Sequence, residues 1–248
     1  MYHKCGAADG PFDRRGAASV RHAGAGPGAG PTDGRDAVKP PYWDEAVREL
    51  GTRDRVLRQL IATYPDIHIT RRGDAFTTLA RAIVGQQISV KAAQTIWNRL
   101  VKATRAGGEP VVLSPARLAR TRTTTLRTVG LSERKADYLR DLARHFVSGR
   151  LDPSVWPAMD DERLIVALTD VNGIGRWTAE MFLMFHELRA DILPVGDIGL
   201  QNAMARHYFD GVRPAIAQMR DHAERWQPYR SVATWYLWRS LDPIPVEY

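Results

Sequence analysis

A glycine-rich turn is the first pattern in the sequence whose residue types could do chemistry. The segment Asn172-Gly173-Ile174-Gly175 separates two apolar stretches, and Arg176 and Trp177 follow it directly. Two glycines around Ile174 allow a sharp turn with positive φ and expose backbone amides at the start of a helix, where the N–H groups and the helix dipole favour a phosphate. Such a turn could hold a nucleic-acid strand without reading its sequence.

The same glycine turn has two other interpretations. An ordinary corner between two packed helices needs the same residues, and the turn taken alone does not separate it from a phosphate site. A dinucleotide-binding loop fits less well, because the third glycine of that motif is missing and a helical pattern, not a strand, precedes the turn.

The first two aspartates after the turn are Asp191 and Asp197. A fixed carboxylate can stabilise positive charge that develops on a substrate. Asp197 also directly precedes the segment Ile198-Gly-Leu-Gln-Asn-Ala-Met204, which is predicted to be helical. An aspartate directly before a helix is typical of an N-cap. From the residues alone, the N-cap is the favoured interpretation.

The elements that must position these residues are predicted to be helices. From Tyr42 onward the apolar residues recur at helical spacing, and alternating stretches long enough for a sheet strand are almost absent. Ser89 and Ser132 are expected N-caps, the first after a polar turn at residues 85–88 and the second after Gly130. Further helices are expected at about 161–168, 176–188, 198–208, 214–226 and 231–240. The fold class is therefore all-α.

The amino-acid composition narrows the class of protein and the kind of binding partner. The 248 residues carry a net charge of +7, which favours a polyanionic partner such as nucleic acid. Residues 1–39 are rich in Gly, Ala and Pro and are expected to be a disordered tail, leaving residues 40–248 as the folded core. Cys5, the only cysteine, lies in that tail, so a cluster held by four thiolates of one chain is excluded. No stretch approaches the ~20 apolar residues of a membrane span.

Several motifs in a fixed order resemble the helix-hairpin-helix (HhH-GPD) DNA glycosylases, closest to the 3-methyladenine DNA glycosylase II group. The strongest are Gly173-Ile-Gly-Arg-Trp-Thr-Ala179 and Asp191-Ile-Leu-Pro-Val-Gly-Asp-Ile-Gly-Leu200. Three more are Arg81-Ala-Ile-Val-Gly-Gln-Gln-Ile-Ser89, Gly130-Leu-Ser-Glu-Arg-Lys-Ala136 and Trp226-Gln-Pro-Tyr-Arg-Ser231. The likeness spans about residues 74–238, and it lacks the N-terminal β-rich domain that some members carry.

The resemblance implies a two-lobed helical core with the active-site cleft between the lobes. It also reverses the interpretation of Asp197, which matches the family's catalytic aspartate, whereas Asp191 matches a surface acid and is the weaker candidate. A carboxylate beside the deoxyribose would stabilise the positive charge left when the base departs and would orient the attacking water.

The resemblance also implies a pocket for the damaged base. Trp177 and Trp238 match aromatic pocket positions, with Met181 and Tyr236 nearby at helical spacing, although aromatic residues on helices are more often part of a core. An indole attracts a cationic, alkylated purine by stacking and cation–π contact. Relatives that also cut the backbone have a lysine where this chain has Trp177, and no lysine follows Lys135. A monofunctional enzyme is therefore expected.

The remaining implied roles concern the DNA. Gln87 matches the side chain that fills the gap left by a flipped base, with a solvated loop glutamine as the alternative. The phosphate-binding group would comprise Gly173, Gly175, Arg176 and Thr178. Relatives often bind Na⁺ or K⁺ through hairpin carbonyls, which here would be those of Thr169, Val171 and Ile174. No other cofactor is expected to be required.

The predicted function is hydrolysis of the N-glycosidic bond of alkylated purines, 3-methyladenine and 7-methylguanine, in base excision repair. The expected partner is double-stranded DNA with a damaged base, and no association with a membrane is expected. The enzyme is expected to be a monomer. Its expected location is the cytoplasm, in association with the bacterial nucleoid, or wherever the genome resides. Two alternatives stay open: a non-catalytic helix-hairpin-helix DNA-binding protein, and a glycosylase for neutral damaged bases.

Overall fold

The computed structural model describes residues 39–71, 73–104 and 113–241. Within these ranges all regular secondary structure is helical, which confirms the all-α prediction. The expected disordered tail, residues 1–39, lies outside the described residues except for Lys39. None of the helices in the described part of the chain is long and apolar enough to span a bilayer.

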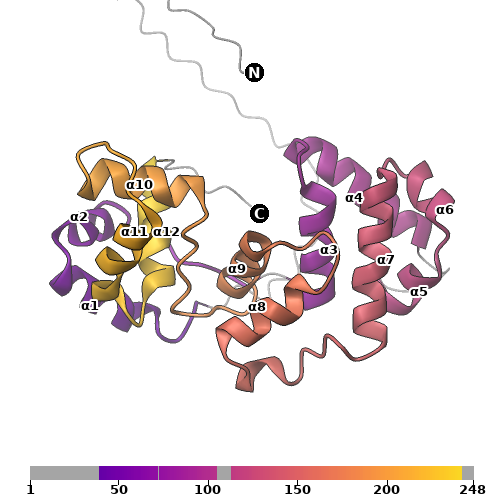
Figure 1. Ribbon diagram of the computed structural model, residues 1–248, viewed down its shortest axis with the longest axis horizontal. Helices are drawn as coiled ribbons and strands as arrows, with labels where there is room; N and C mark the ends of the chain where they lie inside the picture. Colours follow the sequence, from indigo (N-terminus) through magenta and orange to yellow (C-terminus); the bar gives the residue numbers. More distant parts are fainter. Residues whose placement is uncertain (1–38, 72, 105–112, 242–248) are drawn as a thin grey trace, which may run out of the picture. The chain divides into compact units, whose positions relative to one another are not determined.

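One group of helices is formed by the middle of the chain (Figure 1). Its members are α3 (Ala75–Gly85), α4 (Val90–Thr104), α5 (Pro115–Arg120), α6 (Thr123–Thr128), α7 (Glu133–Val147), the short 3-10 helix η1 (Trp156–Ala158), α8 (Asp161–Thr169) and α9 (Arg176–Phe185). Helix α7 packs against α3, α5 and α6, while α9 packs against α8 and α3. Helix α3 is therefore in contact with both α7 and the second helix of the glycine turn.

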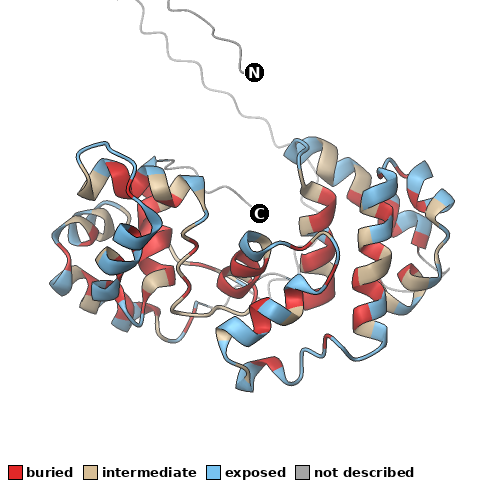
Figure 2. Cartoon of the chain, viewed as in Figure 1, coloured by how far each residue is buried: buried red, intermediate tan, exposed pale blue. Residues whose placement is uncertain are grey.

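A second group joins the two ends of the described chain. It comprises α1 (Trp43–Arg53), α2 (Arg55–Thr63), α10 (Ile198–Tyr208), α11 (Ile216–Ala223), the 3-10 helix η2 (Glu224–Trp226) and α12 (Arg230–Leu241). Helix α12 packs against α1, α2 and α10, and it is buried almost all round (Figure 2). A helix that is buried on every side needs no polar face, which explains its weak amphipathic pattern. These two groups agree with the expected division into two lobes.

Helix starts follow the capping residues. Ser132 Oγ accepts a hydrogen bond from Lys135 N, and Ser89 Oγ accepts one from Ala92 N, each at 3.3 Å, as predicted. Helix ends differ more from expectation. Helix α9 ends at Phe185, not near 188, where Leu188 takes a left-handed φ of 55°. The segment expected as one helix over 214–226 divides into α11 and η2.

Candidate active site

Asp197 is the N-cap of α10. Its Oδ1 accepts a hydrogen bond from Leu200 N at 2.7 Å, which satisfies one of the amides that the first turn leaves free. The interpretation as a helix cap is therefore correct as a statement of geometry. It does not exclude a second role, because Oδ2 takes no part in the cap.

Two tryptophans donate to the same carboxylate. Trp238 Nε1 of α12 lies 2.8 Å from Asp197 Oδ1, and Trp177 Nε1 of α9 lies 2.9 Å from Oδ2. Three N–H donors from three helices thus fix the plane of one carboxylate. The structure therefore brings together the three residues that the sequence singled out most strongly.

Gly199 makes this approach of Trp238 possible. A Cβ atom at residue 199 would lie 3.0 Å from Asp197 Oδ1 and 3.2 Å from both Cδ1 and Nε1 of Trp238. These separations are tighter than ordinary van der Waals contact. The absence of a side chain therefore leaves room for the indole, a role that the sequence did not indicate.

The aromatic surroundings of Asp197 are asymmetric. Trp177 is 42% exposed, whereas Trp238 is half-buried and stacks on Phe185, with ring centroids 6.0 Å apart and planes at 15°. Phe185 was missed by the sequence analysis, although it follows Trp177 by eight positions and so shares its side of α9. Met181, one turn after Trp177, is buried and 8% exposed.

Tyr236 is not part of this group. Its side chain is fully buried, and its ring packs against Trp43 of α1 at a centroid distance of 6.2 Å. Two positions along an α-helix rotate a side chain by roughly 200°, so Tyr236 and Trp238 point to different sides of α12. We therefore exclude Tyr236 from the expected base pocket.

The glycine turn is built around Gly173. This residue has a φ of 89°, and a Cβ on it would lie 2.2 Å from Cδ2 of Tyr138 on α7, so only glycine fits without movement. Gly175 is different: it is the N-cap of α9 with a φ of −89°, and a Cβ on it would meet nothing within 4 Å. The expectation of positive φ therefore holds for the first glycine only. Thr178 is half-buried in the first turn of α9.

A carboxylate on α7 holds the tip of this turn. Asp141 Oδ2 accepts hydrogen bonds from Asn172 N at 2.9 Å and from Asn172 Nδ2 at 2.8 Å. Neither Asp141 nor Tyr138 was expected to matter, because they lie far from the turn in sequence. Together they attach the turn to one face of α7.

Arg176 does not join the phosphate-binding group. Its guanidinium makes a bidentate pair with Glu162 of α8, each N–O distance being 2.7 Å, and its Nε lies 3.0 Å from Glu180 Oε1. These hydrogen bonds, those of Glu162 first, raise the pKa of Arg176, and burial raises the pKa of Glu180. Residues four apart share one side of a helix, so pairing with Glu180 directs Arg176 away from the turn. Its charge is thus already neutralised by carboxylates.

Gln87 occupies the turn between α3 and α4. Its side chain is exposed and its φ is 57°, a left-handed conformation that is uncommon for a residue other than glycine. Ile88 and Val90, which follow it, are also exposed. With Ser89, which is exposed as well, the turn and the start of α4 present two polar and two apolar side chains to solvent.

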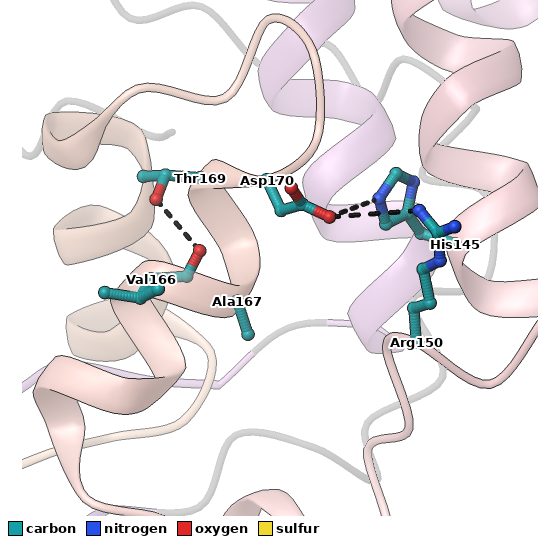
Figure 3. A pocket seen from close by; sticks show the side chains of 6 residues that line it. All are labelled: His145, Arg150, Val166, Ala167, Thr169 and Asp170. Atoms are coloured by element: carbon teal, nitrogen blue, oxygen red, sulfur yellow. Dashed lines mark hydrogen bonds and ion pairs between the residues drawn. The ribbon is translucent and has the colours of Figure 1, made fainter.

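A hollow of about 570 Å³ lies apart from Asp197 (Figure 3). It is lined by His145, Arg150, Val166, Ala167, Thr169 and Asp170. His145 is buried between two acceptors, with Nδ1 2.9 Å from Asp141 O and Nε2 3.1 Å from Asp170 Oδ2. Because these residues belong to α7, α8 and their adjoining turns, the hollow is separate from the group around the carboxylate.

The ion expected at the turn would need main-chain oxygens. The described residues contain no cluster of three or more His, Cys, Asp or Glu side chains suited to a metal. Val171 O accepts a hydrogen bond from Ile174 N at 3.1 Å. A carbonyl oxygen has a second lone pair, so this oxygen could still contact a cation.

The sequence of the chain is similar to that of known DNA repair proteins. The model of the HhH-GPD superfamily of base excision DNA repair proteins matches residues 80–228. The Bacillus subtilis protein YfjP is 36% identical over 169 residues, a match that covers 67% of this chain and 59% of that relative. The chain thus spans less than two thirds of this relative's length.

The solved structures that are similar to the chain include two from Bacillus halodurans and Schizosaccharomyces pombe. A DNA-3-methyladenine glycosidase from Bacillus halodurans is 34% identical with a TM-score of 0.72, over 83% of this chain and 91% of that one. A 3-methyladenine DNA glycosylase from Schizosaccharomyces pombe, solved in complex with abasic DNA, is 29% identical with a TM-score of 0.68. That match covers 82% of this chain and 100% of the other.

Proposed function

The chain belongs to the HhH-GPD superfamily of base excision DNA repair proteins, and from this premise we propose that it hydrolyses the N-glycosidic bond of alkylated purines in DNA. The substrates would be 3-methyladenine and 7-methylguanine. One observation carries the proposal: the carboxylate of Asp197 is fixed by the indole N–H groups of Trp177 and Trp238. The names of the two similar structures support the same reaction and lesion.

The chemistry needs one anionic group and one water. When the base leaves with the electrons of the glycosidic bond, positive charge develops on the deoxyribose, and the carboxylate of Asp197 stabilises that charge. Water then adds its oxygen to the anomeric carbon and releases a proton. A base alkylated at a ring nitrogen is cationic and leaves as a neutral molecule, so the step needs neither a general acid nor a cofactor.

The base pocket would be formed by the tryptophans. A cationic purine that lies against an indole face gains about 0.5–2 kcal/mol from cation–π contact. Trp177 is the more accessible of the two, while Phe185 supports Trp238 from behind by stacking. Met181, buried one turn along α9, would form part of the floor.

The glycine turn would bind a phosphate of double-stranded DNA. The amides of Gly173, Gly175 and Thr178 lie in the turn and in the first turn of α9, where a helix N-terminus attracts anions. Gln87 would enter the duplex when the target base leaves the stack. The DNA complex of the Schizosaccharomyces pombe relative supports DNA as the partner.

Hydrolysis without strand cleavage follows from the side chains present. A lyase reaction through the hairpin helix needs an amine that can form a Schiff base, and α9 carries Trp177 where lyase relatives carry lysine. No lysine follows Lys135 in the sequence. The enzyme is therefore proposed to be monofunctional.

A monovalent cation is proposed at the turn as a finer detail. The carbonyls of Thr169, Val171 and Ile174 would hold Na⁺ or K⁺, and the ion would add positive charge on the side that faces the phosphate. Neutral oxygen donors suit a hard cation of low charge. Thermal unfolding in K⁺, Na⁺ or a bulky organic cation, at one ionic strength, would test this site directly.

The function is tested with Asp197→Asn. Asparagine is also a good N-cap, so α10 should keep its start while the anionic charge is lost. Release of base from methylated duplex DNA should fall by at least about 10²–10³-fold, the size expected for the loss of a preorganised electrostatic group. Binding to abasic-site DNA should persist. The matched control is Asp160→Asn, the exposed N-cap of α8, which should leave base release unchanged.

The same assay separates the alternatives. If the wild-type protein binds the duplex but releases no base from any lesion, the chain is a non-catalytic helix-hairpin-helix DNA-binding protein. A panel of duplexes, each with a single lesion, distinguishes the substrates. Release of oxidised or deaminated bases alone would show that the pocket serves neutral lesions and would contradict the role proposed for the tryptophans.

A further inference from the structure

The Gln87 turn is joined to the glycine turn by a residue beside its tip. Gln86 Nε2 donates to Gly173 O at 2.8 Å, so the end of α3 is tied to the turn between α8 and α9. The two segments are 87 positions apart in sequence. Figure 1 shows α3 next to α7, and the packing of α3 against α9 agrees with this link.

Lys135 of α7 holds the same turn by two further hydrogen bonds. Its Nζ donates to Val84 O and to Gln86 O, both at 2.7 Å. The last carbonyls of a helix have no partner within the helix, and an ammonium group near them is favourable. Burial lowers the pKa of Lys135. The position is also unfavourable for α7, because Lys135 lies in its first turn, where the helix dipole disfavours a cation.

The second of these bonds acts on the backbone of the tip. Gln86 O belongs to the peptide group that precedes Gln87, and Gln87 holds a φ of 57°. A left-handed conformation of a non-glycine residue is disfavoured unless its surroundings fix it. Lys135 fixes that peptide plane, and Gln86 connects it to Gly173.

We propose that Lys135 and Gln86 are positioning residues that set the Gln87 tip at a fixed distance from the phosphate-binding turn. A phosphate held at the glycine turn then determines where Gln87 meets the duplex. Neither residue is bonded to Asp197, so both act on base flipping and not on bond cleavage. The inference rests on the proposed function, because it assumes that the two turns engage one DNA duplex.

The consequence is a dependence on base pairing. Extrusion of a paired base costs a few kcal/mol, and extrusion of a mispaired base costs less. A loosened tip should therefore reduce excision most where unpairing is hardest. A general loss of stability or of charge would reduce excision from both kinds of duplex equally.

The experiment compares Lys135→Met and Gln86→Met with wild type. Single-turnover excision of one alkylated purine is measured in two duplexes, one with the normal partner base and one with a mismatch. Each variant should lose about tenfold on the paired lesion, equivalent to about 1.4 kcal/mol of barrier, and about threefold or less on the mispaired one. Lys135→Arg, which retains donors for both carbonyls, should keep most of the paired rate. Lys91→Met, an exposed charge on α4, is the control.

A second measurement does not depend on catalysis. Fluorescence of 2-aminopurine beside an abasic site reports unstacking when saturating protein binds, and the rise should be smaller for both methionine variants than for wild type. Equal losses on paired and mispaired lesions, or an unchanged fluorescence rise, would overturn the proposal. If wild type releases no base but the fluorescence result holds, the proposed reaction fails while the positioning role stands.

Discussion

Asp197 receives its three hydrogen bonds unequally. Oδ1 accepts from Leu200 N and Trp238 Nε1, whereas Oδ2 accepts, among the residues that the structure describes, from Trp177 alone, whose side chain is partly exposed. Oδ1 therefore fixes the carboxylate to α10 and α12. In the proposed reaction Oδ2 would be the oxygen that faces the sugar, because it accepts fewer hydrogen bonds than Oδ1 among the described residues.

Gly199→Ala tests how closely that carboxylate must be placed. The new methyl group would press on Asp197 Oδ1 and on the Trp238 indole. Base release should fall by about tenfold or more, toward the 10²-fold that a misplacement of about 1 Å can cause. The free energy of unfolding should not fall in parallel with the rate of base release, since alanine is favoured over glycine within a helix by about 1 kcal/mol.

The control for Gly199→Ala is Gly196→Ala. Residue 196 lies next to Asp197 in sequence, and a Cβ there would meet nothing within 4 Å. Base release and thermal unfolding are measured for both variants. Equal activity in the two proteins would mean that the position of Trp238 against the carboxylate has no importance for the reaction.

Single residues also show what sequence can predict about this site. Asp197, Trp177 and Gly173 were predicted because each belongs to a short local motif. Phe185 and Gly199 were missed, and Tyr236 and Arg176 were assigned to the wrong surroundings, because their roles depend on rotation about a helix axis and on neighbours from distant segments. Arg176 is the clearest case, since Glu162 and Glu180 neutralise a charge that the local sequence presents as free.

At the level of elements, the sequence predicted the positions of the helices better than the tertiary contacts between them. The starts of α4, α7, α8, α9 and α10 lie at or within one residue of expectation, because capping residues and apolar spacing are local signals. The contacts of the glycine turn with Asp141 and Tyr138 on α7 join segments about thirty residues apart. No periodicity within either segment indicates such contacts.

Helix α11 carries a histidine that should make stability depend on pH. His222 packs against the rings of Tyr208, Phe209 and Trp226, and burial, then Arg225, lowers its pKa below the ordinary value of 6.5, with Asp54 acting in the opposite direction. Between the lowered pKa and 6.5 the unfolded chain binds more protons than the folded one. The free energy of unfolding should therefore rise with pH through this window. The contribution of neutral His222 to stability should be lost progressively as the pH falls below about 6.5.

The measurement is urea unfolding of wild type and His222→Phe at several pH values between about 5 and 7. Phenylalanine keeps an aromatic ring among the other rings and cannot titrate. The slope of unfolding free energy against pH should be smaller in the variant. Some slope should remain, because burial also lowers the pKa of His207. Parallel curves for the two proteins would contradict the assignment to His222.

At the scale of the whole described molecule, the site depends on both helix groups. Trp177 comes from α9 of the middle group, while Asp197 and Trp238 come from α10 and α12 of the group that joins the two ends of the chain. The N-terminal helices α1 and α2 contribute no side chain to the carboxylate's hydrogen bonds among those described. They support the site indirectly, by packing on α12.

Asp54 is a polar link between α2 and the C-terminal helices. It is the N-cap of α2, is 5% exposed, and accepts hydrogen bonds from Tyr208 OH on α10 and from Trp226 Nε1 on η2. Burial, followed by the charge of Asp54, raises the pKa of Tyr208, so the phenol keeps its proton to a higher pH than an ordinary tyrosine. One carboxylate thus connects three elements from opposite ends of the sequence.

Asp54→Ala should therefore destabilise the fold more than loss of a helix cap alone. Two donors, the buried Trp226 indole and the half-buried Tyr208 hydroxyl, would lose their acceptor, and we expect a loss of about 2–4 kcal/mol in the free energy of unfolding. Asp160→Ala removes the exposed cap of α8 and should cost about 1 kcal/mol. Urea unfolding followed by tryptophan fluorescence measures both. If the two variants lose equal stability, the side chain of Asp54 is only a cap, and the packing of apolar side chains alone would hold α2 against α10 and η2.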